Sequence, residues 1–273
     1  MRNITMQNNN PDIINLPLLE CIRRSFTFAI KNLKHLSFIC LSWFGIVIFE
    51  IISGFPFLQS LQEENESILG IASALLLLAA SLSLLVSTCR IVIDKFKPTP
   101  WYIHFAKAEL KVFGYSLILS GVMALLWAIL FVTIGVLLKM PENSYTFTYL
   151  VPVALGYIVF TYIARYYLIY PAKAIGNNDF KLQKSFALTK GNANKLAIGI
   201  ILSSMPFMIL SQVFVFLYIF MDVDSFIGKT LITTCLTICS FGDSILKASF
   251  YAHAYQYFIF FDKQAKEDVK NDD

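Results

Sequence analysis

The chain has 273 residues, of which 57% are apolar and only 15% are charged, and its formal net charge is +4. In a soluble globular protein about a quarter of the residues are charged, because the surface faces water. This composition excludes an ordinary soluble globule, predicts lipid around the chain, and gives no reason to expect nucleic-acid binding.

The first predicted element is an amphipathic helix at residues 17–34. Leu18, Ile22 and Phe26 fall on one face, whereas Arg24 and Lys31 fall on another. A basic amphipathic helix lies along the membrane headgroups and turns its lysines toward anionic lipid. We expect membrane lipids as partners, with lipid sensing or docking of a cytoplasmic protein as the role. The simpler alternative is a topological anchor.

Six apolar runs follow, each long enough to cross a bilayer core, which takes roughly 20 helical residues. They lie near residues 36–58, 68–93, 112–138, 147–170, 196–221 and 231–261, and a polar tail follows at 262–273. The predicted fold is therefore an all-α membrane protein with six transmembrane helices, in one polytopic domain at residues 1–273.

Two further amphipathic helices are predicted, each directly before a span. One lies at 100–111 and the other at 179–190, where Asn178 or Asp179 can cap the start and Gly191 can provide the stop. The chain thus reads as three repeats of interfacial helix, span, short outer turn and span. The alternative is that any basic lead-in to a span looks like this.

The basic residues predict the orientation. Lysine and arginine cluster before the first span, in the second-to-third and fourth-to-fifth connections, and in the tail, whereas the three short turns carry mainly Glu and Asp. Basic loops stay in the cytoplasm during insertion. We therefore expect both termini on the cytoplasmic side of a bacterial inner membrane.

One stretch resembles a known family. An Arg near the end of a span precedes a Pro, and the next helix reads Ser-x-x-Leu-Thr-x-Gly. The positions are Arg165, Pro171, Ser185, Leu188, Thr189 and Gly191. This pattern resembles uncharacterised bacterial six-span membrane proteins related to the membrane domain of glycerophosphodiester phosphodiesterases. The resemblance implies a membrane fold and an accessory role beside a lipid-hydrolysing enzyme, but no chemistry, because the reaction belongs to a separate soluble domain.

From the residues alone, Arg165 is expected to snorkel to the headgroups, and Pro171 to end the fourth span. Gly191 is expected to permit the corner into the fifth span.

Three ionisable residues fall deep within the predicted spans: Glu50 in the first, and Asp243 and Lys247 in the sixth. A charge at the bilayer centre costs at least ~2.5–3.5 kcal/mol, so such groups pair, neutralise or face the bundle interior. Asp243 and Lys247 are one helical turn apart and are predicted to pair, with Glu50 as a second carboxylate near Lys247. The cluster serves either a transport path or helix packing.

No catalytic, cofactor-binding or metal-binding motif is present in the sequence. Cys235 and Cys239 are one turn apart, but no third ligand lies close in sequence. We expect a non-enzymatic protein without cofactors that organises lipids or a protein partner, which the sequence does not identify. The alternative is a small transporter or channel that uses Glu50, Asp243 and Lys247.

Overall fold

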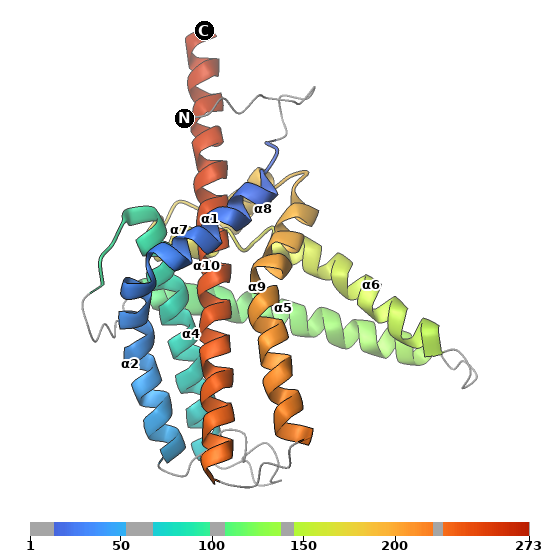
Figure 1. Cartoon of the computed structure of the whole chain (residues 1–273). Helices are drawn as coiled ribbons and strands as arrows, with labels where there is room; N and C mark the ends of the chain where they lie inside the picture. Colours follow the sequence, from blue (N-terminus) through green and yellow to red (C-terminus); the bar gives the residue numbers. More distant parts are fainter. Residues whose placement is uncertain (1–13, 53–67, 99–106, 138–144, 221–225, 273) are drawn as a thin grey trace.

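The structure is a computed structural model and describes residues 14–52, 68–98, 107–137, 145–220 and 226–272. Within these ranges every regular element is a helix (Figure 1). The helices are α1 (Leu18–Lys31), α2 (Leu33–Ile52), α4 (Ile68–Asp94), α5 (Lys107–Leu137), α6 (Tyr145–Ala164), α7 (Ile169–Ala174), α8 (Leu182–Leu188), α9 (Ala193–Phe220) and α10 (Phe226–Asp272).

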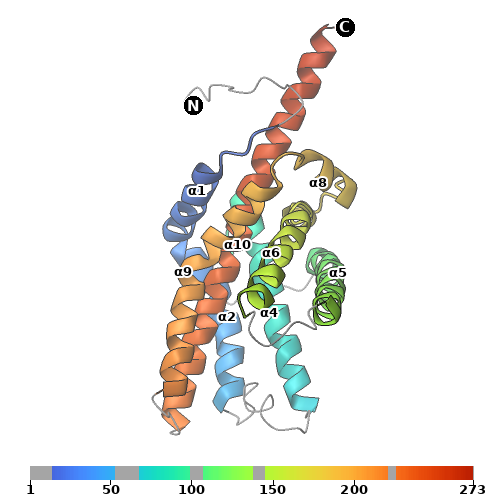
Figure 2. The ribbon, with the colours of Figure 1, turned by 90° about the vertical axis from the view of Figure 1, so that its right-hand side faces the viewer.

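Four long helices form the body of the molecule. α2, α4, α9 and α10 run side by side, and α10 contacts each of the other three (Figures 1 and 2). The sequence forms long helices here because apolar residues predominate over about 20 to 30 positions, and no proline lies within α2, α4 or α10. α10 is the central column to which the other long helices are attached.

The α5–α6 pair runs in a different direction. The two helices pack against each other and leave the body at a steep angle, so that Figure 2 views them nearly end-on. Much of their apolar surface is exposed, including Leu125 and Val153. The structure therefore does not bring all six predicted spans into one parallel bundle.

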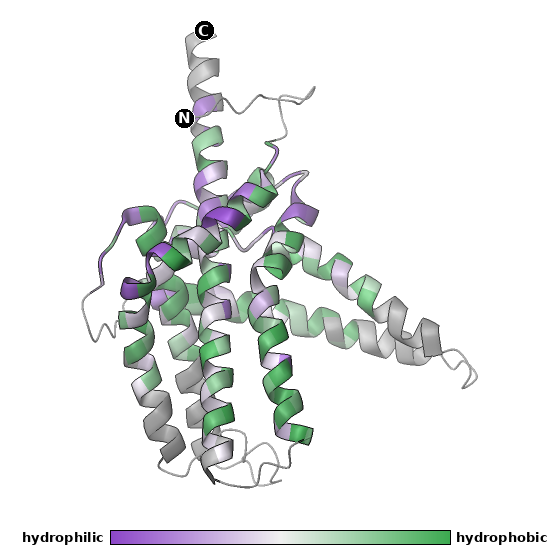
Figure 3. Ribbon diagram, in the orientation of Figure 1, coloured by the Kyte–Doolittle hydropathy of each residue, from purple (hydrophilic) through white to green (hydrophobic). Residues whose placement is uncertain are grey.

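The packed core lies toward one end of the body. There the first helix α1 and the short helix α7 close over α4, α9 and α10, around the fully buried side chains of Val86, Phe250 and Phe258. A second cluster joins α2 to α4 and α10 through Ile39, Leu84 and Phe241. The same end carries the polar residues in Figure 3, whereas the helices below it are mainly apolar.

Four stretches of the described residues are long and apolar enough to cross a membrane: Lys107–Leu126, Val153–Ala174, Ala193–Phe220 and Thr230–Asp262. Large exposed apolar side chains line them, such as Phe216 and Phe220 on α9. A continuous apolar surface of this kind is covered by lipid or by another protein rather than by water. The chain therefore has the helices of a membrane-associated protein.

Several predicted boundaries change. The interfacial helix at 17–34 is present as α1, but the one at 179–190 is reduced to the seven residues of α8. Residues 100–106 of the other lie outside the described residues, and Lys107–Lys111 continue into α5 without a break. The tail at 262–273 is not separate, because α10 extends to Asp272. The threefold repeat stays a prediction, since only α1–α2–α4 and α8–α9–α10 share the same order of short and long helices.

Candidate functional site

The two charges predicted in the sixth span face each other on α10. Lys247 Nζ donates a hydrogen bond of 2.6 Å to Asp243 Oδ2, and both side chains are partly buried. The pairing follows from helix geometry, because residues four apart stack on one face. Asp243 Oδ1 is buried and makes no hydrogen bond within the described part of the chain. The pair thus cancels most of the charge that lipid would meet.

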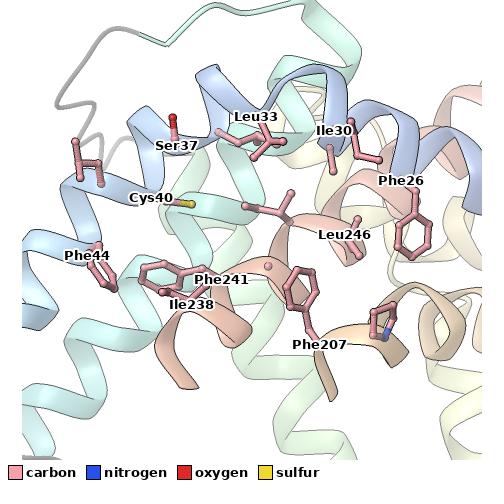
Figure 4. A pocket seen from close by; sticks show the side chains of 16 residues that line it. Phe26, Ile30, Leu33, Ser37, Cys40, Phe44, Phe207, Ile238, Phe241 and Leu246 are labelled. Atoms are coloured by element: carbon pink, nitrogen blue, oxygen red, sulfur yellow. The ribbon is translucent and has the colours of Figure 1, made fainter. Parts of the chain in front are cut away.

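Glu50 lies in the last turn of α2, and its side chain is outside the described residues. Phe44 of α2 lies opposite Ile238 and Phe241 of α10 (Figure 4). Glu50 is six residues beyond Phe44, or roughly 9 Å farther along the axis at ~1.5 Å per residue. Since α10 runs the other way, Asp243 lies on the opposite side of that level, so the contact of Glu50 with Lys247 stays a prediction.

The motif residues Arg165, Ser185 and Thr189 come together at the turn after α6. Arg165 donates to the carbonyl oxygen of Phe186 at 2.6 Å and to Thr189 Oγ1 at 3.3 Å, and its guanidinium lies 3.3 Å from the centre of the Phe186 ring. In return, the Ser185 hydroxyl donates to the Arg165 carbonyl oxygen at 2.6 Å. These contacts fasten α8 to the end of α6, whereas the expectation that Arg165 snorkels to the headgroups stays a prediction.

The other motif residues shape the same corner. α6 ends at Ala164, before Arg165, so Pro171 does not end this helix and instead lies buried in the first turn of α7. Leu188 is the last residue of α8 and packs against the core. Gly191 has φ +77°, a conformation that favours glycine, and it turns the chain from α8 into α9 as expected.

An ion pair that the sequence analysis missed joins α4 to α5. Arg90 Nη1 lies 3.7 Å from Glu109 Oε1, whose side chain is fully buried, and Arg90 Nε donates to the Ala174 carbonyl oxygen at 2.8 Å. Arg90 therefore holds the start of α5 and the end of α7 against α4. The sequence held one indication of a structural role for Arg90: like Arg165, it lies near the end of an even-numbered predicted span.

Lys173 forms a second unexpected anchor in α7. Its side chain is buried, and its ammonium donates to the carbonyl oxygens of Asn177 and Asn178, both at 3.0 Å. The predicted cap at Asn178 or Asp179 is wrong, because α8 begins at Leu182 with Lys181 at its N-cap position and no side-chain cap. In the loop before it, Asn177 Oδ1 accepts a hydrogen bond from the Phe180 N–H. The basic connection is thus a folded unit rather than a lone amphipathic helix.

The N-terminal segment is fastened to the far end of the chain. The Asn192 amide accepts from the buried Leu16 N–H at 2.8 Å and donates to the Ile14 carbonyl oxygen. Lys195 donates to Asn15 Oδ1, and the Tyr257 hydroxyl donates to the Asn15 carbonyl oxygen at 2.9 Å. We call Ile14–Leu16 the N-terminal strap. It holds α1 against α9 and α10.

Between α1, α2, α9 and α10 lies an apolar groove of about 570 Å³. Side chains of α1, α2, α9 and α10 point into it (Figure 4). On another face of α1 lies a polar hollow lined by Arg23, Arg24, Lys31 and His253. α1 thus separates an apolar groove from a basic hollow.

Across the described ranges, no three His, Cys, Asp or Glu side chains lie close enough to hold a metal ion. The candidate sites are therefore the Asp243–Lys247 pair, the basic end of the bundle and the apolar groove beneath α1.

Comparisons with known proteins add no information about the fold or the candidate sites. No protein-family model matches the chain, and neither the curated proteins nor the solved structures include a significantly similar one.

Proposed function

We propose that the chain is a non-enzymatic protein of the bacterial cytoplasmic membrane that gathers anionic lipids, or a partner complex that needs them, at its basic end. One observation carries the proposal: basic side chains crowd one end of an apolar helical body. Polar residues gather at the end where α1, α8, the end of α4 and the starts of α2, α5 and α9 lie (Figures 1 and 3). The basic residues in or next to these segments are Arg23, Arg24, Lys31, Lys34, Lys95, Lys97, Lys107, Lys111, Lys181, Lys184, Lys190 and Lys195.

The physical basis is the anionic inner leaflet. A basic residue near such a surface contributes about 1 kcal/mol of attraction, and this attraction weakens as salt is added. The positive-inside rule also favours placing this end in the cytoplasm. Both termini then lie inside, because α1 and the end of α10 belong to that end of the molecule (Figure 1).

The proposal includes six spans, and the α5–α6 pair is its critical part. Both helices are long and apolar enough to cross a bilayer, although they leave the body at a steep angle. If they cross, the turn between them faces outward together with the two turns at the far end of the body.

Reporter fusions test this topology directly. Alkaline phosphatase, which is active only outside the cytoplasm, is inserted after Glu64, Glu142 or Asp224, and a fluorescent protein that folds in the cytoplasm is placed after Asp273. We expect phosphatase activity at all three turns and fluorescence at the C-terminus. Activity at Glu64 and Asp224 but not at Glu142 would mean that the α5–α6 pair lies along the membrane. Activity of phosphatase at the C-terminus would overturn the orientation.

A second candidate, a transporter or channel, is favoured by one observation. Asp243 Oδ1 is buried in a membrane-compatible helix without a hydrogen bond among the described residues, and buried ionisable groups in such helices often serve transport. Its pairing with Lys247 supports a packing role equally well. Substitution of Asp243 and Lys247, singly and together, separates the two candidates.

A further inference from the structure

The groove beneath α1 has the shape of a site for a single hydrocarbon chain. It follows α2 from Leu33 to Phe44, which is roughly 16 Å at ~1.5 Å per residue. Half of a bilayer core about 30 Å thick is ~15 Å. The groove therefore has the length of an acyl chain in one leaflet.

The lining is almost wholly apolar. Of the residues that face the groove, only Ser37 and Cys40 carry a polar group other than the backbone. Pro206 and Phe207 of α9 form one wall, and Phe241 and Gly242 of α10 form the floor (Figure 4). Leu41 and Ile238, both half exposed at 51%, leave the side of the groove open toward surrounding lipid.

The basic face of α1 lies directly beside the groove. Phe26 faces the groove, whereas Arg23, three residues earlier and thus its neighbour on the helix surface, faces the basic hollow. Arg24 is already held by Glu20 at 2.5 Å, but Arg23 is exposed and has no ion pair among the described residues. A phosphate at the edge of α1 would therefore meet Arg23 first.

We propose that this groove binds one anionic phospholipid of the cytoplasmic leaflet, with an acyl chain against α2, α9 and α10 and the phosphate at Arg23. The inference rests on the proposed function, but it replaces a diffuse attraction by a single saturable site. Loose headgroup attraction weakens steeply with salt, whereas a chain buried in the groove stays bound.

The experiment measures lipid retention by native mass spectrometry of the full chain. The protein is stripped of lipid in detergent and titrated with dioleoyl phosphatidylglycerol or with dioleoyl phosphatidylcholine, which has the same chains without net charge. We expect one phosphatidylglycerol per chain, bound at least tenfold more tightly than phosphatidylcholine and retained at high salt.

Two variants fill the groove from different walls, Leu41→Trp on α2 and Ile238→Trp on α10. The matched control is Ile209→Trp, which adds the same bulk at an exposed position of α9 that does not face the groove. We expect each groove variant to lower the affinity for both lipids at least tenfold and the control to lower it less than twofold. Thermal unfolding of each variant checks that it is folded, and the two walls make the test independent of any one substitution.

The phosphate contact has its own pair of variants. Arg23→Glu should weaken phosphatidylglycerol about tenfold and leave phosphatidylcholine unchanged, whereas Lys190→Glu, an equal charge change at the same end of the bundle, should weaken phosphatidylglycerol less than threefold, because it removes only diffuse attraction. Equal losses from both variants would leave only diffuse attraction and overturn the site.

The remaining outcomes identify other occupants. Retention that is unchanged in both groove variants, displacement by excess sn-glycerol 3-phosphate, or a dimer that forms only in the lipid-free protein would each refute the inference. The proposed function fails separately, through the reporter fusions, whose outcome does not depend on the groove.

Discussion

At the scale of single residues, charged side chains contact partners close to them, and these contacts reduce the cost of placing a charge in an apolar environment. Asp243 and Lys247 bond to each other, Arg165 stacks on Phe186, and Glu109 lies beside Arg90. Each of these groups would be costly alone in an apolar environment. Each of these charged side chains therefore has a partner close to it in the structure.

The Asp243–Lys247 pair gives the residue-level prediction. Asp243→Asn or Lys247→Met alone leaves the other charge unpaired and should lower the free energy of unfolding by about 1–3 kcal/mol, between exposed and fully buried pairs. The double variant Asp243→Asn/Lys247→Met should recover most of that loss. Thermal unfolding of the three variants in nanodiscs measures the coupling.

The same variants separate packing from transport. If the double variant assembles and cells that carry it keep their phenotype, the charges serve packing. A stable double variant without the phenotype would instead support a transport path through the bundle.

Contacts between side chains can be predicted from the sequence only where the two partners are close along the chain. The Asp243–Lys247 bond follows from their spacing of four residues. By contrast, Arg165 reaches Phe186 only because the chain turns back after α6, and no pattern of spacing announces a corner of that shape. Without knowledge of this contact, the sequence predicted that Arg165 snorkels to the headgroups.

At the scale of elements, one close crossing fixes how the first and last helices meet. Gly199 of α9 lies against the ring of Phe250 on α10 and against Leu18 of α1. A Cβ at Gly199 would overlap the Phe250 ring and come within 2.9 Å of Leu18 Cδ1. Because Phe250 is fully buried, its ring has no free space to move into.

The prediction compares two glycines that both face a phenylalanine. Gly199→Ala should lower the free energy of unfolding by about 1–3 kcal/mol, the typical cost of overpacking. Gly242→Ala also overlaps a ring, that of Phe207, but this ring borders the open groove and can turn aside. Thermal unfolding midpoints should therefore fall clearly more for Gly199→Ala, and an equal fall would show that Phe250 is not confined.

The elements themselves were largely predictable and their ends were not. Long apolar runs located α2, α4, α5, α6, α9 and α10, because a membrane-compatible helix needs length and apolarity above all. The end of α6 was wrong by six residues, because Tyr166–Tyr170 is as apolar as the helix before it. Only the contacts of Arg165 and Ser185 mark that corner.

At the scale of the whole molecule, contacts far apart in sequence hold the start of the described chain against α9 and α10. The N-terminal strap is held by Asn192 and Lys195 from α9 and by Tyr257 from α10. Behind it, Cys21 of α1 is buried in the core, and burial raises the pKa of the Cys21 thiol to about 11. The Cys21 thiol is therefore protonated near neutral pH and unreactive.

The strap gives the molecule-scale prediction. Asn192→Ala leaves the buried Leu16 N–H without its partner, which costs about 1–3 kcal/mol and should release α1 from the core. Water then reaches Cys21, its pKa falls back toward the ordinary value, and the rate of maleimide labelling at pH 7.5 should rise at least tenfold. Peptide-resolved mass spectrometry measures labelling at this cysteine alone.

Asn194→Ala, an exposed neighbour on the same turn, is the matched control and should leave the rate unchanged. The buried Cys89, whose thiol lies 3.7 Å from the Ala248 carbonyl oxygen, should stay unlabelled in both variants. Labelling of Cys89 together with Cys21 would indicate general unfolding and contradict a local release of α1.

The arrangement of the helices in space could not be predicted from the sequence. Apolar runs specify six long helices but not their directions, and nothing in residues 107–164 sets the α5–α6 pair apart from the helices of the body. The groove could not be predicted either, because its walls combine α1 and α2 with α9 and α10, which lie far along the chain. Contacts between distant segments decide both features.

The N-terminal strap also constrains how the protein is made. A ribosome synthesises α1 first, yet the partners of the strap, Asn192 and Tyr257, are added after about 180 and 240 further residues. At the roughly 5–20 residues per second of translation, the newborn α1 waits many seconds for them. During this interval the apolar face of α1 can bind the bilayer surface. There its exposed apolar side chains are shielded from chaperones until α10 has been synthesised.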